Sequence, residues 1–321
     1  MQHIFESWCV QIDVTNYCNQ SCLYCSRYNR HLKKEQRAHM PLEQFVAALD
    51  SLRHWPKKIG IIGGEPLLHP QFRHINLLLR KHFPREKLGL WTSGLPRTEL
   101  EDPRTDSDIM STYGFIAYNP HTPEQQEQCK HQPLTVAIRE VVSDSELMWK
   151  LIDNCWVQRT WCATITHKGT YFCEVAAAQD LLLNDGANAW PIEPGWWKRH
   201  PSEFRSQVEK LCPNCGMCIP MERELLHKKT EKFTPLLLQS FRDKNLRLVR
   251  DKDVEVFGET FSKEDIRNNI NTWYPGNYRG DLKDDNTALE GLGFTGKIDY
   301  FSDRHRKAVR NRKIFLASFF P

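Results

Sequence analysis

The sequence predicts an α/β fold in which parallel strands form an open, partial (β/α)6 TIM-like barrel, followed by a small C-terminal β-hairpin and helix domain. Strand-like and helix-like segments alternate through the first half, and the five or six units fit a partial barrel. Near residue 151 the alternation stops and a hairpin pattern follows. Repeated strand–helix units imply a parallel sheet, whose ligands bind at the carboxyl ends of the strands.

The elements of residues 1–150 follow from apolar periodicity. The best helix pattern is "PLEQFVAALDSL" at 41–52, in which Phe45, Leu49 and Leu52 share one face and Pro41 suits a first turn. We predict strands at 9–14, 58–64, 87–94, 113–119 and 134–142, and further helices at 72–83 and 146–153.

The remainder divides into two regions. The segment "WCATITHKGTYFC" at 161–173 predicts a hairpin that turns at His167, Lys168 and Gly169. We therefore expect a barrel over 1–150, a cysteine-rich region over 151–225, and a charged C-terminal extension over 226–321 as a candidate cover for the active site.

Composition limits the classes of function. The chain has 321 residues, a net charge of +4 and no run of eighteen apolar residues, so we expect no membrane span. The first residues lack a signal-peptide pattern, which predicts a cytoplasmic protein. Eleven cysteines in a reducing compartment indicate metal or redox use rather than disulfides.

Cys18, Cys22 and Cys25 follow the first strand in a C-x3-C-x2-C spacing. Three thiolates can hold three irons of a four-iron cluster and leave the fourth iron open to a small molecule. The alternative is structural zinc, which takes four ligands in a closed site and for which His31 would complete a Cys3His set.

This spacing, with Tyr24 before the third cysteine, resembles the signature of the radical S-adenosylmethionine (radical SAM) enzymes. The motif "GGEP" at 63–66 and the strand end "WTSG" at 91–94 match two further positions of that family. The likeness extends over residues 8–145 and implies a four-iron, four-sulfur (4Fe–4S) cluster that binds SAM. Reductive cleavage of SAM then gives a 5′-deoxyadenosyl radical, which abstracts a hydrogen atom from the substrate.

The resemblance also implies which residues surround SAM. Gly63 and Gly64 would let the backbone approach the ligand, and Glu65 would contact the SAM ammonium or brace the turn. Thr92 and Ser93 are candidates for the ribose hydroxyls, or cap the next helix. The cofactor-binding candidates are Tyr24, Gly63, Gly64, Glu65, Pro66, Thr92, Ser93 and Asn119.

A second set of cysteines follows residue 150 and consists of Cys155, Cys162, Cys173, Cys212, Cys215 and Cys218, with a predicted hairpin that ends at Cys173. It resembles the auxiliary-cluster region of the Twitch and SPASM subgroups, and in finer detail members that act on carbohydrates and aminocyclitols. The implied ligands of a second 4Fe–4S cluster are Cys155, Cys173, Cys212 and Cys215, with Cys162 able to replace Cys155 and Cys218 able to replace either member of the pair. A zinc ribbon is the alternative. Cys9 and Cys129 are expected to be structural.

The spare thiols suggest how the reaction ends. In a dehydrogenation the auxiliary cluster would take an electron from the substrate radical. In an epimerisation a thiol would return a hydrogen atom, and Cys218 or Cys162 is the candidate catalytic donor. A buried spectator thiol is the simpler interpretation of either one.

Substrate and partners are read from weaker signals. Trp196 and Trp197 would stack on a sugar or base, or pack in the core, and the aromatic loop at 271–281 would cover the barrel mouth. The basic cluster at 304–313 would grip phosphates, although a solvated helix explains it as well.

The predicted function is oxidation or epimerisation of a small sugar, aminocyclitol or nucleoside-type substrate. A reductase such as flavodoxin or ferredoxin would supply the electron. Two alternatives remain open: radical modification of a peptide or of a nucleic-acid base, and a non-enzymatic zinc protein that binds nucleic acid. Nucleic acid is not the favoured partner, since a net charge of +4 does not identify it.

Overall fold

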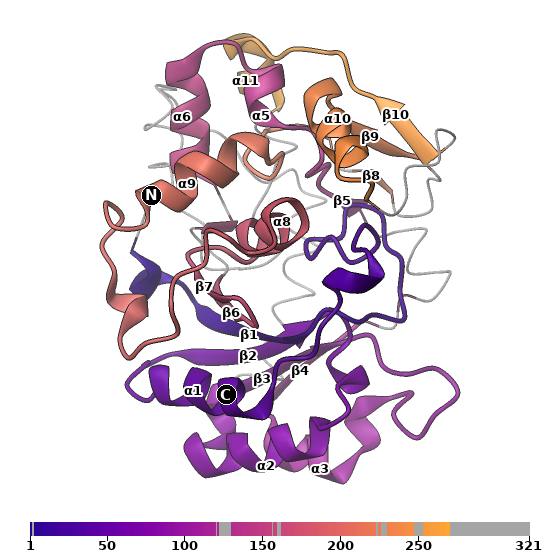
Figure 1. Cartoon of the computed structure of the whole chain (residues 1–321), viewed down its shortest axis with the longest axis vertical. Coiled ribbons are helices and arrows are strands. Elements are labelled where there is room, and N and C mark those ends of the chain that lie inside the picture. Colours follow the sequence, from indigo (N-terminus) through magenta and orange to yellow (C-terminus); the bar gives the residue numbers. More distant parts are fainter. Residues whose placement is uncertain are drawn as a thin grey trace, which may run out of the picture.

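A computed structural model describes residues 1–269, apart from residues 2, 120, 122–129, 156, 159–161, 223, 226–229 and 247–252. Its centre is a six-stranded sheet in the order β4-β3-β2-β1-β6-β7 (Figure 1). The strands are β1 (Cys9–Thr15), β2 (Lys58–Gly63), β3 (Leu88–Thr92), β4 (Phe115–Tyr118), β6 (Cys162–Thr166) and β7 (Gly169–Tyr171).

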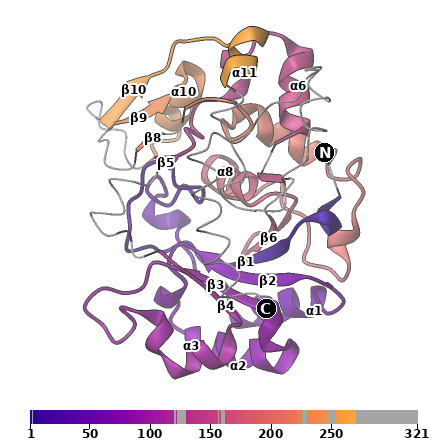
Figure 2. The ribbon, with the colours of Figure 1, turned by 180° about the vertical axis from the view of Figure 1, so that it is seen from behind.

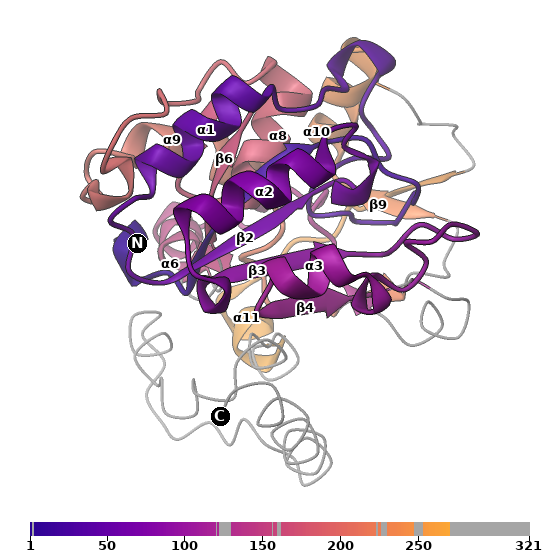
Figure 3. The same cartoon turned by 90° about the horizontal axis from the view of Figure 1, so that it is seen from below.

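Neighbouring strands are parallel from β4 through to β6, and β7 alone runs antiparallel, as the second strand of a hairpin. The crossovers from β1 to β4 are made by α1 (Leu42–Ser51), α2 (Phe72–His82) and α3 (Ser107–Thr112). These helices cover one face of the sheet, and α8 (Glu174–Asn184) lies against the other, as the view from below shows (Figure 3).

The central strand β1 shows why the sheet is buried on both faces. Val10, Ile12 and Val14 are fully buried on one face. Gln11 and Asp13 alternate with them and therefore lie on the opposite face, toward α8. Parallel sheets are covered by helices on both sides, so polar residues on an inner face need partners there.

The α/β prediction is confirmed, and so are the first four strands and the three predicted helices, which are α1, α2 and α6 (Ser145–Asp153). The third crossover helix, α3, was not predicted from the sequence. The fifth predicted strand, at 134–142, is wrong. That segment contains the short helix α5 (Ile138–Val141), and the backbone of Leu134 accepts a hydrogen bond from Gly216 rather than from a strand. A short run of apolar residues is compatible with a buried helix as well as with a buried strand, and hydrophobic periodicity cannot distinguish a helix from a strand in so short a segment.

The predicted hairpin at 161–173 is present as β6 and β7, and β6 pairs in parallel with β1. The sheet therefore includes strands from both sides of residue 151. The elements after residue 129 that lie outside this sheet pack on the α8 side, visible from behind in Figure 2. They are α6 (Ser145–Asp153), α9 (Arg205–Leu211), α10 (Pro235–Asp243), α11 (Lys263–Asn269), and the short strands β5 (Lys130–His131), β8 (Glu224–Leu225), β9 (Glu231–Phe233) and β10 (Val254–Val256).

Within the described residues, no helix combines the length and the apolarity that crossing a membrane would require.

Candidate metal and cofactor site

The carboxyl ends of β1 to β4 lie along one edge of the sheet because these strands are parallel. The cysteine loop begins after Thr15, which pairs with Gly63 at the end of β2. Thr92 ends β3, and its carbonyl accepts a hydrogen bond from the backbone N–H of Asn119, which follows β4. The fold therefore brings the predicted site segments to the edge where α/β proteins bind ligands.

The thiols of Cys18, Cys22 and Cys25 lie partly buried in the loop after β1. Burial, and then the neighbouring charge of Cys25, raises the pKa of the Cys18 thiol to about 12. The pKa of Cys22 is raised for the same reasons, with Cys25 and Cys18 as the neighbours. The three sulfurs are thus close enough for their charges to interact, and a bound cation would reverse this effect by favouring the thiolates.

Two left-handed residues shape this loop. Tyr24 and Tyr28 have φ values of 50° and 52°, on either side of Cys25. Such a conformation is unfavourable for a bulky side chain and persists only when the surroundings hold it in place. Two hydrogen bonds to β9 stabilise this conformation at Tyr24. The backbone N–H of Tyr24 donates to Glu231 Oε1 at 3.0 Å, and the backbone N–H of Lys232 donates to the Tyr24 hydroxyl at 2.7 Å.

Glu231 is almost fully buried and also faces two basic side chains. Its Oε2 lies 3.2 Å from His31 Nε2 and 3.5 Å from Arg30 Nη1. Burial alone would raise the pKa of Glu231, but His31 and Arg30 hold it below its ordinary value. His31 thus faces this carboxylate instead of completing a Cys3His zinc site with the three cysteines, and neither residue pattern nor spacing predicted the contact.

Asn19 is a second residue that the sequence did not single out. Its Nδ2 donates to the carbonyl of Gly94 at 3.1 Å, and its Oδ1 lies 3.3 Å from Ser93 Oγ. The residue next to Cys18 is therefore tied to the end of β3. On the other side of the loop, Cys22 Sγ lies 3.8 Å from Nδ1 of His121, two residues beyond Asn119.

The donor set fits an iron–sulfur cluster better than a single ion. A structural zinc site takes four protein ligands, and His31, the candidate for the fourth position, faces Glu231 instead. A cubane cluster takes one thiolate at each iron corner, so its ligands surround a larger body. Three thiols on one loop meet that requirement at three corners.

Gly63 and Gly64 are required by the backbone itself. A Cβ on Gly63 would lie 2.0 Å from the carbonyl oxygen of Thr15, and one on Gly64 would lie 2.0 Å from that of Tyr17. Gly64 N and Glu65 N donate to these same two carbonyls, at 2.6 and 2.8 Å. The two glycines thus allow the end of β2 to pack directly against the start of the cysteine loop.

Glu65 is buried and braces the ends of β2 and β3. Its Oε1 accepts from Thr92 Oγ1 at 2.5 Å and from Leu67 N at 3.1 Å, while its Oε2 accepts from the N–H and the hydroxyl of Ser93, both at 2.7 Å. Burial raises the pKa of Glu65, against the lowering effect of these hydrogen bonds. The geometry matches the bracing alternative, with Thr92 and Ser93 as its partners.

Three other cofactor candidates occupy the same edge. Pro66 is buried at the start of a 3₁₀ turn (Pro66–Leu68), and Asn119 is exposed. The ring of Tyr24 is buried against the segment around Lys232. The contacts of these residues with SAM remain predictions.

A second group of thiols surrounds one apolar cavity. Cys155, Cys173, Cys212, Cys215 and Cys218 all line it, together with side chains such as Phe172 and Leu211. Burial, then the charge of Cys155, raises the pKa of Cys215 to about 12, and the pKa values of Cys212 and Cys218 are raised well above the ordinary thiol value. The four cysteines proposed as ligands therefore line one cavity together with Cys218, which was the predicted alternative to either member of the Cys212 and Cys215 pair.

The remaining cysteines are placed less fully. Cys162 begins β6 and its backbone pairs with that of Cys9 on β1. Cys9 is buried, as expected of a structural thiol. Cys129 and the side chain of Cys162 lie outside the described parts of the chain.

A buried polar group lies between the two thiol sets. Arg27, two residues after Cys25, donates to Oε1 of Gln11 and to Oε2 of Glu174, the latter at 2.8 Å. Glu174 directly follows Cys173. The Arg27 guanidinium is also 3.5 Å from Oδ1 of Asp13 on β1, and the arrangement joins the two sets across the inner face of the sheet.

The two adjacent tryptophans belong to the hydrophobic core. This agrees with the second of the two interpretations given from the sequence, packing rather than stacking on a substrate. Trp196 and Trp197 are buried, and Trp197 Nε1 donates to the carbonyl of Ser51 at the end of α1 at 3.1 Å. Neither ring is available to stack on a sugar. The loop at 271–281 and the basic cluster at 304–313 lie outside the described residues.

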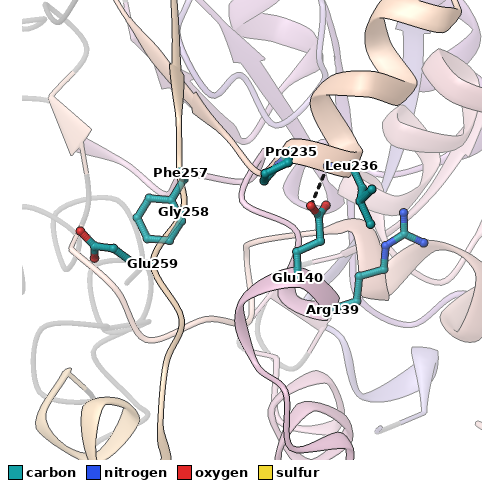
Figure 4. A pocket seen from close by; sticks show the side chains of 7 residues that line it. All are labelled: Arg139, Glu140, Pro235, Leu236, Phe257, Gly258 and Glu259. Carbon is teal, nitrogen blue, oxygen red and sulfur yellow. Dashed lines mark hydrogen bonds between the residues drawn. The ribbon is translucent and has the colours of Figure 1, made fainter.

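A further hollow lies at the start of α10, lined by residues from α5, α10 and the segment after β10 (Figure 4). There the Glu140 carboxylate accepts from Leu236 N at 2.7 Å and Leu237 N at 3.0 Å, which caps the first turn of α10. It shares no lining residue with either thiol set, and its carboxylate already has a structural role.

Comparison with known proteins agrees with this geometry over the first part of the chain. The family described as "Radical SAM superfamily" matches residues 12–121. A protein of Methanocaldococcus jannaschii named "Probable GTP 3',8-cyclase" is 42% identical over 100 residues, which are 31% of this chain and 33% of that protein. The chain thus matches about a third of the length of this curated relative.

Two solved structures match the chain at low similarity. One is the crystal structure of BtrN in complex with AdoMet and 2-DOIA, with a TM-score of 0.39, 16% identity, and coverage of 65% of this chain and 92% of that one. The other is SeMet BtrN in an open conformation, with a TM-score of 0.37, 15% identity, and coverage of 69% and 97%. The three-cysteine loop and the ends of β2 and β3 thus lie within the part of the chain, residues 12–121, that matches the radical SAM superfamily model.

Proposed function

We propose that the chain is a radical SAM enzyme that abstracts a hydrogen atom from a sugar, aminocyclitol or nucleoside-type substrate and leads to its oxidation or epimerisation. The observation that carries the proposal is the juxtaposition of the three-cysteine loop with the Glu65, Thr92 and Ser93 network at one edge of the sheet. When bound, a 4Fe–4S cluster and SAM would supply the 5′-deoxyadenosyl radical. An electron carrier such as flavodoxin or ferredoxin is the proposed reductant.

The chain's own residues would hold and orient these groups. Cys18, Cys22 and Cys25 would ligate the cluster, and Asn19 and Tyr24 would fix their loop to β3 and β9. The Thr92 and Ser93 hydroxyls already donate to Glu65, so toward a ribose they would act as acceptors.

The five-thiol cavity supports an auxiliary 4Fe–4S cluster of the Twitch type. Four of its thiols would be ligands, as proposed for Cys155, Cys173, Cys212 and Cys215, and Cys218 would be spare. Cys218 is buried, and its Sγ lies 3.9 Å from the Cys215 carbonyl. As a hydrogen donor it would have to reach the substrate from within the same cavity; Cys162 remains the other candidate.

A purine nucleotide is a second candidate substrate. The relative from Methanocaldococcus jannaschii carries GTP in its name, and the matched 100 residues are the observation in favour. Because that match covers a third of the relative, it supports the radical SAM chemistry more than the choice of substrate.

The decisive experiment is an anaerobic reaction of the iron-loaded protein with SAM, a reductant and a panel of deuterated sugars and nucleotides. We expect about eight irons per chain for two four-iron clusters, and deuterium in 5′-deoxyadenosine when the correct substrate is present. Zinc without iron, and no cleavage of SAM, would contradict the proposal and favour a zinc protein. Solvent deuterium in the product would indicate epimerisation rather than dehydrogenation.

The first prediction concerns the three-cysteine loop. Replacement of Cys18, Cys22 and Cys25 by alanine should halve the iron content and abolish 5′-deoxyadenosine formation, because one cluster loses all its ligands while the other keeps its own. Iron analysis and chromatography of the products check both outcomes. Replacement of Cys9, which lies in β1 outside both sets, is the matched control and should retain both clusters.

A further inference from the structure

A single buried segment, residues 131–137, contacts both cysteine loops. This bridging segment begins at His131, the last residue of β5, and is buried from Gln132 onward. Irregular backbone is seldom buried, because each of its polar groups then needs a partner inside the protein. The partners of the bridging segment therefore show which parts of the chain it holds together.

On one side the bridging segment holds the auxiliary cysteine loop, residues 212–218. Nε2 of Gln132 donates to the carbonyl of Gly216 at 3.1 Å and to that of Ile219 at 2.8 Å. The backbone N–H of Gly216 donates in return to the carbonyl of Leu134 at 3.0 Å. Three hydrogen bonds thus connect the bridging segment to the turn that carries the last two thiols of this loop.

The contact is also a close packing of backbone on backbone. A Cβ on Gly216 would lie 2.2 Å from the carbonyl oxygen of Pro133 and 2.7 Å from that of Val136. Pro133 has a fixed φ and restricts the residue before it, so this part of the chain is stiff. The auxiliary cysteine loop cannot shift toward the bridging segment unless the segment moves with it.

On the other side the bridging segment holds the three-cysteine loop, at the two residues before its third cysteine. Nδ1 of His131 lies 3.0 Å from the carbonyl oxygen of Leu23, and this nitrogen carries the proton because a carbonyl can only accept. Thr135 Oγ1 donates to the carbonyl of Lys232, and the N–H of Lys232 donates to the Tyr24 hydroxyl at 2.7 Å. Leu23 and Tyr24 are therefore connected to the same segment that holds the auxiliary loop.

This shared support couples the two loops mechanically. A cluster on Cys212 and Cys215 would fix the carbonyls to which Gln132 donates, and with them the backbone that carries His131 and Thr135. Without that cluster the auxiliary loop has more freedom, and the support of the three-cysteine loop weakens. Coupling between two sites is reciprocal, so SAM at the first site would stabilise the cluster at the second.

We propose that the bridging segment couples the two metal sites, so that a loaded auxiliary site holds the three-cysteine loop in the geometry that binds SAM. His131, Gln132 and Thr135 are positioning residues, which act through the loops that they hold. The inference rests on the proposed function, and in particular on its second cluster. It deepens that function by giving the second cluster a part in SAM binding.

The test is a double-mutant cycle on the affinity of the oxidised, iron-loaded protein for SAM, measured by equilibrium dialysis without reductant. The four proteins are the wild type, the Cys212→Ala/Cys215→Ala variant, Gln132→Met, and the combination of these changes. Removal of the auxiliary ligands from the wild type should weaken SAM binding by about fivefold or more, as is typical of coupled sites. In the Gln132→Met background the same removal should weaken it by about twofold or less, because the connection is already broken.

A second variant approaches the bridging segment from its other end. Thr135→Val keeps the shape of the side chain and removes only the donor to Lys232, so it takes the place of Gln132→Met in the cycle if that protein does not fold. Gln71→Met, exposed before α2, is the matched control and should leave the fivefold effect intact. Equal factors in the wild-type and variant backgrounds, or no effect of the cysteine replacements on SAM affinity, would overturn the coupling.

Iron analysis and formation of 5′-deoxyadenosine separate this inference from the proposed function. We expect about eight irons per chain in the wild type and about four in the Cys212→Ala/Cys215→Ala variant. If the wild type has both clusters and cleaves SAM, equal factors mean that the coupling alone has failed. If it lacks the second cluster or does not cleave SAM, the proposed function has failed first and the coupling falls with it.

Discussion

At the scale of single residues, Glu65 shows how a motif can serve ligand binding and structure together. The sequence indicated a site residue at the end of β2, and the structure gives it four donors from the turn after it and from β3. An ionised carboxylate can only accept hydrogen bonds, so all four contacts require Glu65 to act as the acceptor. Thr92 and Ser93 were singled out from the sequence as well, but their link to Glu65 depends on the pairing of β2 with β3.

Glu65→Gln is therefore expected to be costly although it is isosteric. The side-chain amide of Gln would place its N–H group opposite a donor of Thr92 or Ser93, where Glu65 has an acceptor oxygen. A buried donor is then left without an acceptor, which lowers the free energy of unfolding by about 2 kcal/mol. Urea unfolding of the iron-loaded protein measures this loss, and equilibrium dialysis should show weaker SAM binding. Glu43→Gln, exposed on α1, provides the comparison; equal stability of the two variants would refute the bracing role.

At the scale of elements, the contact between the end of β2 and the cysteine loop is made by backbone alone. Gly64 has the Tyr17 carbonyl where a side chain would begin, and hydrogen bonds from Gly64 and Glu65 connect the two segments. From the sequence, the two glycines of the GGEP motif were interpreted as letting the backbone approach the ligand, and not as allowing two backbone segments to pack together. Which carbonyl opposes each glycine follows from the register of β1 on β2, and no local pattern contains that register.

Gly64→Ala should separate these two segments. A Cβ at 2.0 Å from the Tyr17 oxygen must displace one backbone from the other, and overpacking of this kind costs about 1–3 kcal/mol or more. We expect reduced stability and loss of roughly half the iron, since the displaced loop carries one of two proposed clusters. Gly258→Ala, which has nothing within 4 Å of the added carbon, should match the wild type in both measurements.

At the scale of the whole molecule, the cysteine loop is held from both sides. Asn19 connects it to β3, and Glu231 and Lys232 connect it to β9. The sequence predicted the strand ends and the three thiols because each depends on neighbours in the chain. It could not predict Glu231, which is 207 positions from Tyr24, nor the burial of Trp197 against α1, because both contacts depend on how distant elements pack.

Glu231→Gln should weaken this connection. A buried carboxylate between His31 and Arg30 is removed, and breaking such a group costs about 3 kcal/mol or more. Because the folded pKa of Glu231 lies below its ordinary value near 4.5, its stabilisation is complete above that pH and is lost as the pH falls through the folded value. The stability difference from the wild type should therefore be largest at neutral pH and shrink in acid.

Urea unfolding at a series of pH values measures this difference, and iron analysis should show preferential loss from the three-cysteine site. Glu255→Gln on β10, whose carboxylate is 4.0 Å from Lys232 Nζ and largely exposed, is the matched control. A difference that is independent of pH would contradict the assignment of the effect to the Glu231 charge.

The anchoring of the loop by β9 also bears on biogenesis. The ribosome synthesises the loop around Tyr24 long before it adds Glu231, which is 207 positions later in the chain. During that interval the nascent polypeptide has no carboxylate to fasten Tyr24 in its left-handed turn. A cluster that requires the anchored loop would therefore be inserted only after β9 has been synthesised and has packed against the loop.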